Sequence, residues 1–297
     1  MDWGLMHWRP FALMAVGASC LTLGDFVIKQ ALLTGTSLQQ IFGLGPLVFQ
    51  LLLIVIAVLS KDGWRAHLPL QHPKVMLVRG LIGLLFSVFA FTSLSTNPYT
   101  QHAMLMQTGP VIASVLSLLI LGEVFSKRII LVASFSLLGA GLIIGPGSGV
   151  LSPWLLLPVF AAAANAAGIV MVARFRDCAT GLGFTFWSSW LVTSLGVVWW
   201  LVGGALLPSW QGMAWIASMA VFMAIGLVCM STAMAWAGRL GIASKVPLMM
   251  YVQTPVALFF GVLFLQESLS GLAVLGACLI LLSGAWMILS QRPVVES

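Results

Sequence analysis

Two polar phrases interrupt apolar stretches of the chain and supply the residues best suited to binding a small molecule. A Gln-Thr-Gly-Pro phrase begins at Gln107 and a Gln-Thr-Pro phrase begins at Gln253, a separation of 253 − 107 = 146 residues in a chain of 297. An amide both donates and accepts hydrogen bonds, which suits a zwitterionic or heteroaromatic ligand. We therefore expect Gln107 and Gln253 to contact substrate, in preference to the alternative of hydrogen-bonded links between helices.

Each phrase ends in a proline, so the same segments also carry a break in the helix. Pro110 and Pro255 each remove one hydrogen bond of the helical backbone, which is costly in lipid unless the freed groups face protein or a cavity. The two prolines are candidate hinges for a rocking motion, with a static kink as the alternative.

Asp25 and Lys29 lie within the first apolar stretch. They are four residues apart with the acid first, which is the favourable order for an ion pair on a helix surface. A carboxylate inside a span is a functional candidate by default, either as a proton carrier or as the partner of a cationic substrate group. The structural alternative is a pair that lowers the cost of placing Lys29 near the outer interface. We count both residues as candidates for substrate binding.

Four further residues are candidates for contact with substrate: His102, Asn165, Tyr251 and Trp236. His102 can titrate near neutrality and gate an entrance, although such a histidine is more often an interfacial side chain. Asn165 interrupts an alanine-rich stretch and serves either a ligand or a packing hydrogen bond. Tyr251 lies two residues before the second glutamine, about 200° around a helix and so on another face. Trp236 can stack on an aromatic substrate or pack against lipid and helices.

The composition excludes an ordinary soluble domain. Apolar residues make up 61% of the chain, charged residues 7%, and the mean hydropathy is +1.10, whereas soluble domains carry about 25% charged residues. The net charge of +6 comes from basic residues scattered singly between apolar runs, which encodes membrane topology and argues against a nucleic-acid partner. The four cysteines show no metal-ligand spacing, so we expect no disulfide framework, no metal site and no cofactor.

At about 20 apolar residues per span, the sequence predicts ten transmembrane helices and no inserted soluble domain. With the N-terminus in the cytoplasm, twelve of the thirteen Lys and Arg residues fall on the internal side and only Lys29 lies near the outer face, as the positive-inside rule requires. We therefore expect a multi-pass protein of the cytoplasmic membrane, with both termini cytoplasmic and the first helix retained. The predicted spans are 10–31, 38–60, 75–96, 99–121, 128–145, 153–173, 182–206, 211–237, 242–265 and 269–290.

Five spans per half is an odd number, so the two halves must cross the membrane in opposite directions. We expect an inverted repeat, with a first unit at 1–148 and a second at 149–297. Two such halves can exchange conformations and so open a midplane site to alternate sides of the membrane. A pore does not need this arrangement.

Several short phrases follow one another in a characteristic order along nearly the whole chain. They are Leu23 to Lys29, Arg79 to Gly83, Leu121 to Glu123, Gln266 to Ser270, and Gly276, Ala277 and Gly284. With the ten spans and the repeat, they resemble the drug/metabolite transporter superfamily, EamA-like branch. The resemblance implies a secondary carrier of small organic molecules whose central cavity is lined mainly by the first, third, fourth, sixth, eighth and ninth spans. Asp25 departs from the family pattern, in which a small or amide side chain is expected.

The leading hypothesis is a secondary active transporter that moves a small polar or zwitterionic metabolite, such as an amino acid or a vitamin, by alternating access. No Walker A sequence is present, which excludes ATP hydrolysis within this chain as the drive. Proton coupling through Asp25 and substrate exchange are the alternatives. A passive channel is the second function considered. An intramembrane enzyme is the third, and the absence of HExxH and GxSxG motifs and of a second intramembrane acid argues against it.

Two further features are interpreted as structural. Glu123 and Glu267 close the apolar runs that follow the two phrases, and we expect them to cap helices or to pair with loops. A GxxxG phrase from Gly141 to Gly145 permits close contact between helices.

Overall fold

All of the regular secondary structure in the described part of the chain is helical. The computed structural model describes residues 3–61, 63–67, 72–122, 127–144 and 153–289. Its helices are α1 (Trp3–Leu33), α2 (Leu38–Leu59), α3 (Trp64–His67), α4 (Pro73–Thr96), α5 (Tyr99–Met106), α6 (Thr108–Leu121), α7 (Lys127–Ile144), η1 (Pro153–Leu156), α8 (Leu157–Arg174), α9 (Gly181–Val202), α10 (Trp210–Leu240), η2 (Val246–Val252), α11 (Gln253–Phe264) and α12 (Gly271–Leu289).

Within the described residues, eight helical segments are long and apolar enough to cross a membrane. Three of them are composite, because α5 continues into α6, η1 into α8 and η2 into α11. The eight coincide with eight of the predicted spans. The helices α7 and α12 fall on the predicted spans 128–145 and 269–290 but are not among the eight. The chain is thus an all-α polytopic membrane protein, and the count of ten spans stays a prediction.

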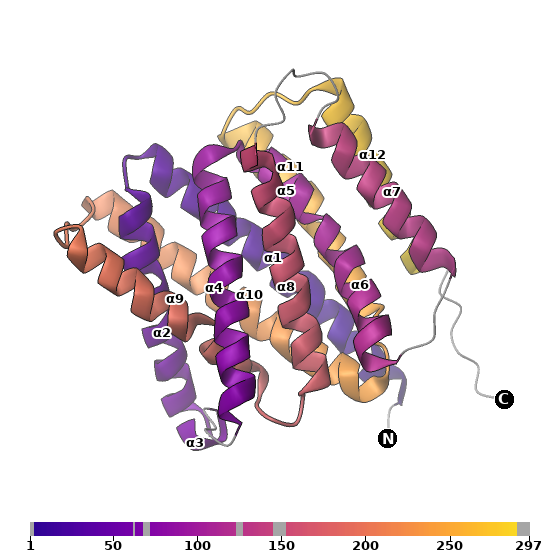
Figure 1. The fold of residues 1–297 in the computed structure, drawn as a ribbon, viewed down its shortest axis with the longest axis horizontal. Coiled ribbons are helices and arrows are strands. Elements are labelled where there is room, and N and C mark those ends of the chain that lie inside the picture. The colour runs from indigo at the N-terminus through magenta and orange to yellow at the C-terminus, as the bar shows by residue number, and fades with distance from the viewer. Residues whose placement is uncertain (1–2, 62, 68–71, 123–126, 145–152, 290–297) are drawn as a thin grey trace.

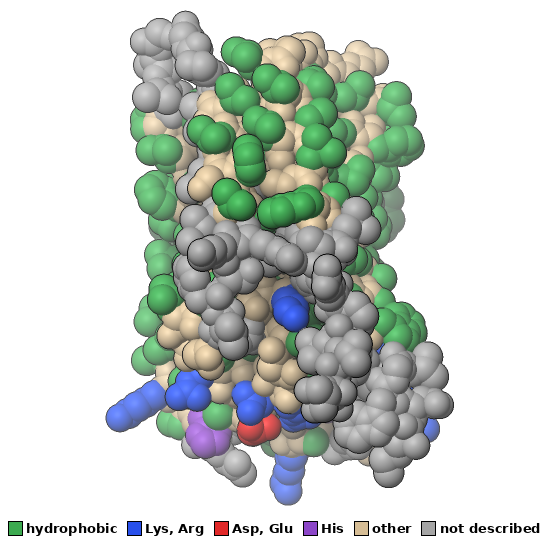
Figure 2. Space-filling model, turned by 90° about the vertical axis from the view of Figure 1, so that its right-hand side faces the viewer, with side chains coloured by type: hydrophobic (Ala, Val, Ile, Leu, Met, Phe, Trp, Pro, Cys, Tyr) green, Lys and Arg blue, Asp and Glu red, His purple; other side chains and the backbone are tan. Residues whose placement is uncertain are grey.

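Large apolar side chains cover much of the outer surface, as expected where lipid replaces water. Leu59 is 79% exposed, Val202 82% and Trp210 89%. Figure 2 shows hydrophobic side chains over the upper part of one face, with the basic side chains gathered towards its lower end. This separation agrees with the predicted one-sided distribution of Lys and Arg.

The spans of the two halves pack in matching pairs. The first span of each half contacts the third span of the other, α1 with α10 and α8 with α4, and the second spans α2 and α9 contact each other. The last spans, α7 and α12, pack side by side at one edge of the bundle (Figure 1). This pairing is compatible with the predicted inverted repeat, which itself stays a prediction. The predicted division between residues 148 and 149 lies outside the described residues and stays a prediction.

The helix is interrupted at both repeated motifs, the one that begins at Gln107 and the one that begins at Gln253, as predicted from their prolines. In the span that contains Gln107, α5 ends at Met106 and α6 starts at Thr108. In the span that contains Gln253, the 3-10 helix η2 ends at Val252 and α11 starts at Gln253. Pro110 and Pro255 are the third residues of α6 and α11. A proline ring clashes with the carbonyl four residues earlier, whereas in a first helical turn its missing N–H costs little. The backbone therefore starts a new helical segment just ahead of each proline.

The close contact expected of the GxxxG phrase occurs two residues earlier than predicted. A Cβ atom on Gly141 would meet nothing within 4 Å, whereas one on Gly139 would lie 2.6 Å from the carbonyl oxygen of Gly276. The backbones of α7 and α12 therefore touch at Gly139 and Gly276. Gly145 lies outside the described residues, as does Glu123.

Candidate functional site

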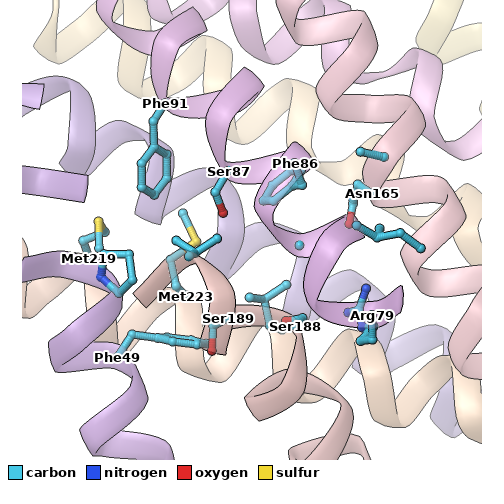
Figure 3. Close-up of a pocket in the computed structure, with 16 residues that line it drawn as sticks. Phe49, Arg79, Phe86, Ser87, Phe91, Asn165, Ser188, Ser189, Met219 and Met223 are labelled. Carbon is cyan, nitrogen blue, oxygen red and sulfur yellow. The ribbon is translucent and has the colours of Figure 1, made fainter. Parts of the chain in front are cut away.

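A cavity, here called the main cavity, lies between α2, α4, α8, α9 and α10 (Figure 3). About 60 Å³ of it is open to the centres of water molecules, which is room for several waters or a compact organic group. Its polar lining consists of Arg79, Ser87, Asn165, Ser188 and Ser189. The larger apolar side chains around it are Phe49, Phe86, Phe91, Met219 and Met223.

A smaller cavity, here called the annex, adjoins the main cavity. It is lined by Thr22, Asp25 and Gln253 among others, and about 10 Å³ is open to water centres, which is room for about one water. Phe86, Asn165 and Met223 line both cavities. The annex is lined by the six spans that the family resemblance implies, namely α1, α4, α5, α8, α10 and α11. The main cavity also involves α2 and α9, which the resemblance did not indicate.

Two glycines allow α4 to approach its neighbours at the level of the main cavity. A Cβ on Gly83 would overlap the backbone carbonyl of Ser188 in α9, and a Cβ on Gly168 of α8 would overlap Nη1 of Arg79. Gly83 therefore sets the spacing of α4 and α9, which brings Ser188 and Arg79 to the same cavity. Gly168 leaves room for the guanidinium group.

Asp25 and Asn165, both predicted from the sequence, line the cavities and make no side-chain hydrogen bond to a described residue. Asn165 is 7% exposed. The alternative reading of Asn165 as a packing hydrogen bond therefore finds no support in the contacts. Oδ2 of the Asp25 carboxylate lies 3.7 Å from Nε2 of His102, which is too long for a hydrogen bond. Both side chains are free to serve a molecule in the cavities.

His102 is fully buried within the protein, so it is not the exposed interfacial side chain that was the alternative to a substrate contact. Its Nδ1 lies 2.9 Å from the Ser93 hydroxyl, while Nε2 faces Asp25 and makes no hydrogen bond. Ser93 in turn accepts a hydrogen bond from the Asn97 amide at 3.1 Å. The chain of polar groups thus runs from the end of α4 to the annex, and fixes the His102 ring beside the carboxylate.

Lys29 does not pair with Asp25. Its Nζ donates to the backbone carbonyls of Leu94 at 3.0 Å and Asn97 at 2.8 Å. These are carbonyls at the C-terminal end of α4, where the helix itself leaves acceptors unpaired and where a cation is favoured. The expected ion pair is therefore replaced by a cap, and the Asp25 carboxylate is left to the annex.

The two predicted glutamines meet, although only one of them reaches a cavity. Gln107 Nε2 lies 3.5 Å from Gln253 Oε1 and 3.4 Å from the Ala103 carbonyl. Gln253 donates to the Ala18 carbonyl of α1 at 3.2 Å and lines the annex. Gln107 is fully buried, and its Oε1 has no hydrogen-bond partner. Gln253 is thus placed for ligand contact, whereas Gln107 lines neither cavity and contacts Gln253.

Tyr251 and Trp236 lie away from both cavities. Tyr251 is 4% exposed and belongs to an apolar cluster with Leu248 of η2 and Ile280 of α12. Trp236 lines a separate surface cavity with Arg9 and Arg239, at the C-terminal end of α10. Of the predicted site residues, Asp25, Asn165 and Gln253 line the cavities. His102 lies beside Asp25, and Gln107 lies beside Gln253. Tyr251 and Trp236 lie elsewhere.

The sequence reasoning missed Arg79, Ser188 and Ser189. The positive-inside pattern counts Arg79 among the topology-defining basic residues, yet it is the seventh residue of α4 and only 5% exposed. An arginine two turns inside a span is itself a sequence signal of function. The serines carry no such signal. Ser188 donates to the Thr185 carbonyl at 2.8 Å, and Ser189 donates to the Gln50 side chain across to α2.

Comparison with known proteins agrees with this architecture. Twenty-six chains of solved structures match the fold; one of them, titled "Crystal structure of protein", has a TM-score of 0.63 and 16% sequence identity, and the match covers 93% of this chain and 96% of that chain. No curated protein sequence matches. Residues 9–145 match the EamA-like transporter family, which indicates a membrane transporter or permease of the drug/metabolite type. The predicted resemblance is thereby confirmed, and the chain carries an EamA-like transporter segment over residues 9–145.

Proposed function

We propose that this protein is a secondary carrier that moves a small polar or zwitterionic organic molecule across the cytoplasmic membrane by alternating access. One observation carries the proposal: the buried Arg79 and Asn165 and the partly buried Asp25, none of which makes a side-chain hydrogen bond to a described residue, line two adjoining cavities between spans of both halves. Unpaired polar groups in a membrane interior are costly and persist where function needs them. The proposal assigns no catalytic residue and needs no cofactor.

Alternating access requires contacts that close one end of the cavities and can be released. Glu267, in the loop after α11, accepts hydrogen bonds from the start of α5, and Lys29 of α1 binds the end of α4. These contacts join the end of α4 and the start of α5, at the end of the bundle opposite the one where the basic side chains of Figure 2 gather (Figures 1 and 2). In our proposal they break when the site opens to that side, with the helix interruptions ahead of Pro110 and Pro255 acting as hinges.

The orientation of the chain is part of the proposal. The clustering of basic side chains at one end supports a cytoplasmic location for that end and for both termini. Reporter proteins whose activity reveals the side of the membrane on which they lie can be fused at the 34–37 and 203–209 turns. We expect these reporters to be external. Fusions in the 174–180 turn are expected to be internal. An external signal from the 174–180 turn would reverse the assignment.

Counterflow in proteoliposomes tests the carrier function. The substrate is first found by comparing the small molecules retained by cells with and without the protein, and the labelled compound is then exchanged across vesicles that contain the purified chain. We expect counterflow that saturates with concentration and that is lost in Asn165→Ala. Trp236→Phe, away from both cavities, is the matched control and should keep the rate. Flux that rises in proportion to concentration without saturation would indicate a passive channel instead.

A further inference from the structure

Arg79 is a buried cation without a counter-charge. Its side chain is 5% exposed, Nε makes no hydrogen bond, and the guanidinium forms neither a hydrogen bond nor an ion pair with any described residue. None of the three acids in the described part of the chain forms an ion pair with Arg79. Asp25 faces His102, Glu267 binds the start of α5, and Asp177 lies near two arginines outside the spans. Burying one charge without a partner is strongly unfavourable.

The guanidinium is directed at the main cavity and given room there. Arg79 lines that cavity, and a Cβ on Gly168 would occupy the position of its Nη1. Figure 3 shows the Arg79 side chain, from α4, and the Asn165 side chain, from α8, on the same side of the cavity. Asn165 likewise forms no hydrogen bond with a described residue, and it can donate through its amide. Two sets of unused donors therefore face the same space.

We propose that Arg79 and Asn165 form a seat for an oxyanion of the substrate, and that this oxyanion is a carboxylate attached to a compact apolar body. The inference rests on the proposed carrier function and names the class of molecule carried. A planar guanidinium matches a carboxylate with two parallel hydrogen bonds. A single cation balances a carboxylate fully, whereas a phosphate monoester would leave charge uncompensated.

The rest of the cavity fits the apolar body. Phe86, Phe91, Met219 and Met223 surround the space beside the seat, and methionine adapts its shape to varied ligands. The seat also belongs to one half only. At the 146-residue period the counterpart of Arg79 is Ile225, which is 44% exposed. The charge is therefore a specialisation of this cavity and not a requirement of the repeated fold.

Binding of matched acid and amide pairs tests the seat. The probes are acetate and acetamide, isovalerate and isovaleramide, and benzoate and benzamide, with inorganic phosphate as a further arm. The thermal midpoint Tm of the purified protein in detergent is followed by tryptophan fluorescence over a range of probe concentrations, because a ligand of the folded state raises Tm. At least one carboxylate should raise Tm while its amide does not. A phosphate effect at lower concentrations than every carboxylate would overturn the carboxylate assignment.

Variants locate the binding at Arg79. Arg79→Gln should weaken carboxylate binding by about 10- to 100-fold, as the loss of charged hydrogen bonds implies, and Asn165→Ala should weaken it less. Arg176→Gln, in the turn after α8, is the matched control and should bind as the wild type does. Without a probe, Arg79→Gln should have a Tm at or above that of the wild type, because it removes an unpartnered buried charge. A marked fall in that Tm would assign Arg79 to the fold and overturn the proposal.

The seat and the carrier function fail in different ways. No carboxylate effect, equal effects of acids and amides, or unchanged binding by Arg79→Gln would each overturn the seat, even if counterflow is saturable. Carboxylate binding through Arg79 without counterflow of any compound would overturn the carrier function and leave the seat standing.

Discussion

Removal of the Glu267 carboxylate, which lines neither the main cavity nor the annex, should destabilise the protein. Oε1 of Glu267 accepts the backbone N–H of Tyr99 at 2.6 Å, and Oε2 accepts both the backbone N–H and the hydroxyl of Thr100 at 2.7 Å. Tyr99 and Thr100 are the first residues of α5. The first N–H groups of a helix have no partner within it, and this end of the helix favours a negative charge. Glu267 thus caps α5 and joins it to the end of α11.

The size of the effect follows from these three contacts. Hydrogen bonds to a charged group contribute about 1.5 to 3 kcal/mol each when buried, and the helix dipole adds about 0.3 to 1 kcal/mol. Glu267 is only half-buried, so water can replace part of the loss. We expect Glu267→Ala to cost about 2 to 4 kcal/mol, which corresponds to a fall in Tm of about 5 to 10 °C in a chain of this size.

Tryptophan fluorescence during heating in detergent measures this change. Glu267→Gln keeps one acceptor oxygen and should fall between the wild type and the alanine variant. Asp177→Ala is the matched control, because that carboxylate is 77% exposed and lies in a turn near two arginines. A Tm for Glu267→Ala within about 1 °C of both the wild type and Asp177→Ala would refute the cap as a stabilising contact.

Three further predictions concern the cavities and the helices that form them. Asp25→Asn should remove the pH dependence of counterflow if this carboxylate, beside His102, carries the coupled proton; a variant with the wild-type rate and pH profile shows that it does not. Gly83→Ala should lower Tm and reduce counterflow together, because its Cβ overlaps the α9 backbone; unchanged values of both would contradict the close contact. A double-mutant cycle with Gln107→Leu and Gln253→Leu, followed through Tm, measures the coupling energy between the two side chains. It should be about 0.6 kcal/mol, as for other interhelical hydrogen bonds in membranes. A coupling energy above about 2 kcal/mol would contradict the long 3.5 Å contact.

The helices and their interruptions were predictable because their causes are local. Long apolar runs require a helix in lipid, since every backbone group must be paired within the segment. The breaks ahead of Pro110 and Pro255 follow from the proline ring and the carbonyl four residues earlier. The one-sided charge pattern is likewise a property of the loops. The sequence alone therefore determined the membrane class, the helical segments, the broken spans and the resemblance to EamA-like transporters, which the family match bears out over residues 9–145.

Only the tertiary structure decided which side chains meet. In lipid, an apolar side chain on a helix surface is as well placed as one in the bundle interior, so hydropathy does not distinguish the face that lines a cavity. Lys29 donates to carbonyls at the end of α4 and not to the acid on its own helix, whereas His102 is buried with its Nε2 facing that acid. In the sequence, Arg79 resembles a topology-defining arginine. Only the structure shows that Gly168 of α8 leaves room for its guanidinium inside the bundle. Such partners come from helices far apart in the chain, and their choice depends on how the whole bundle packs.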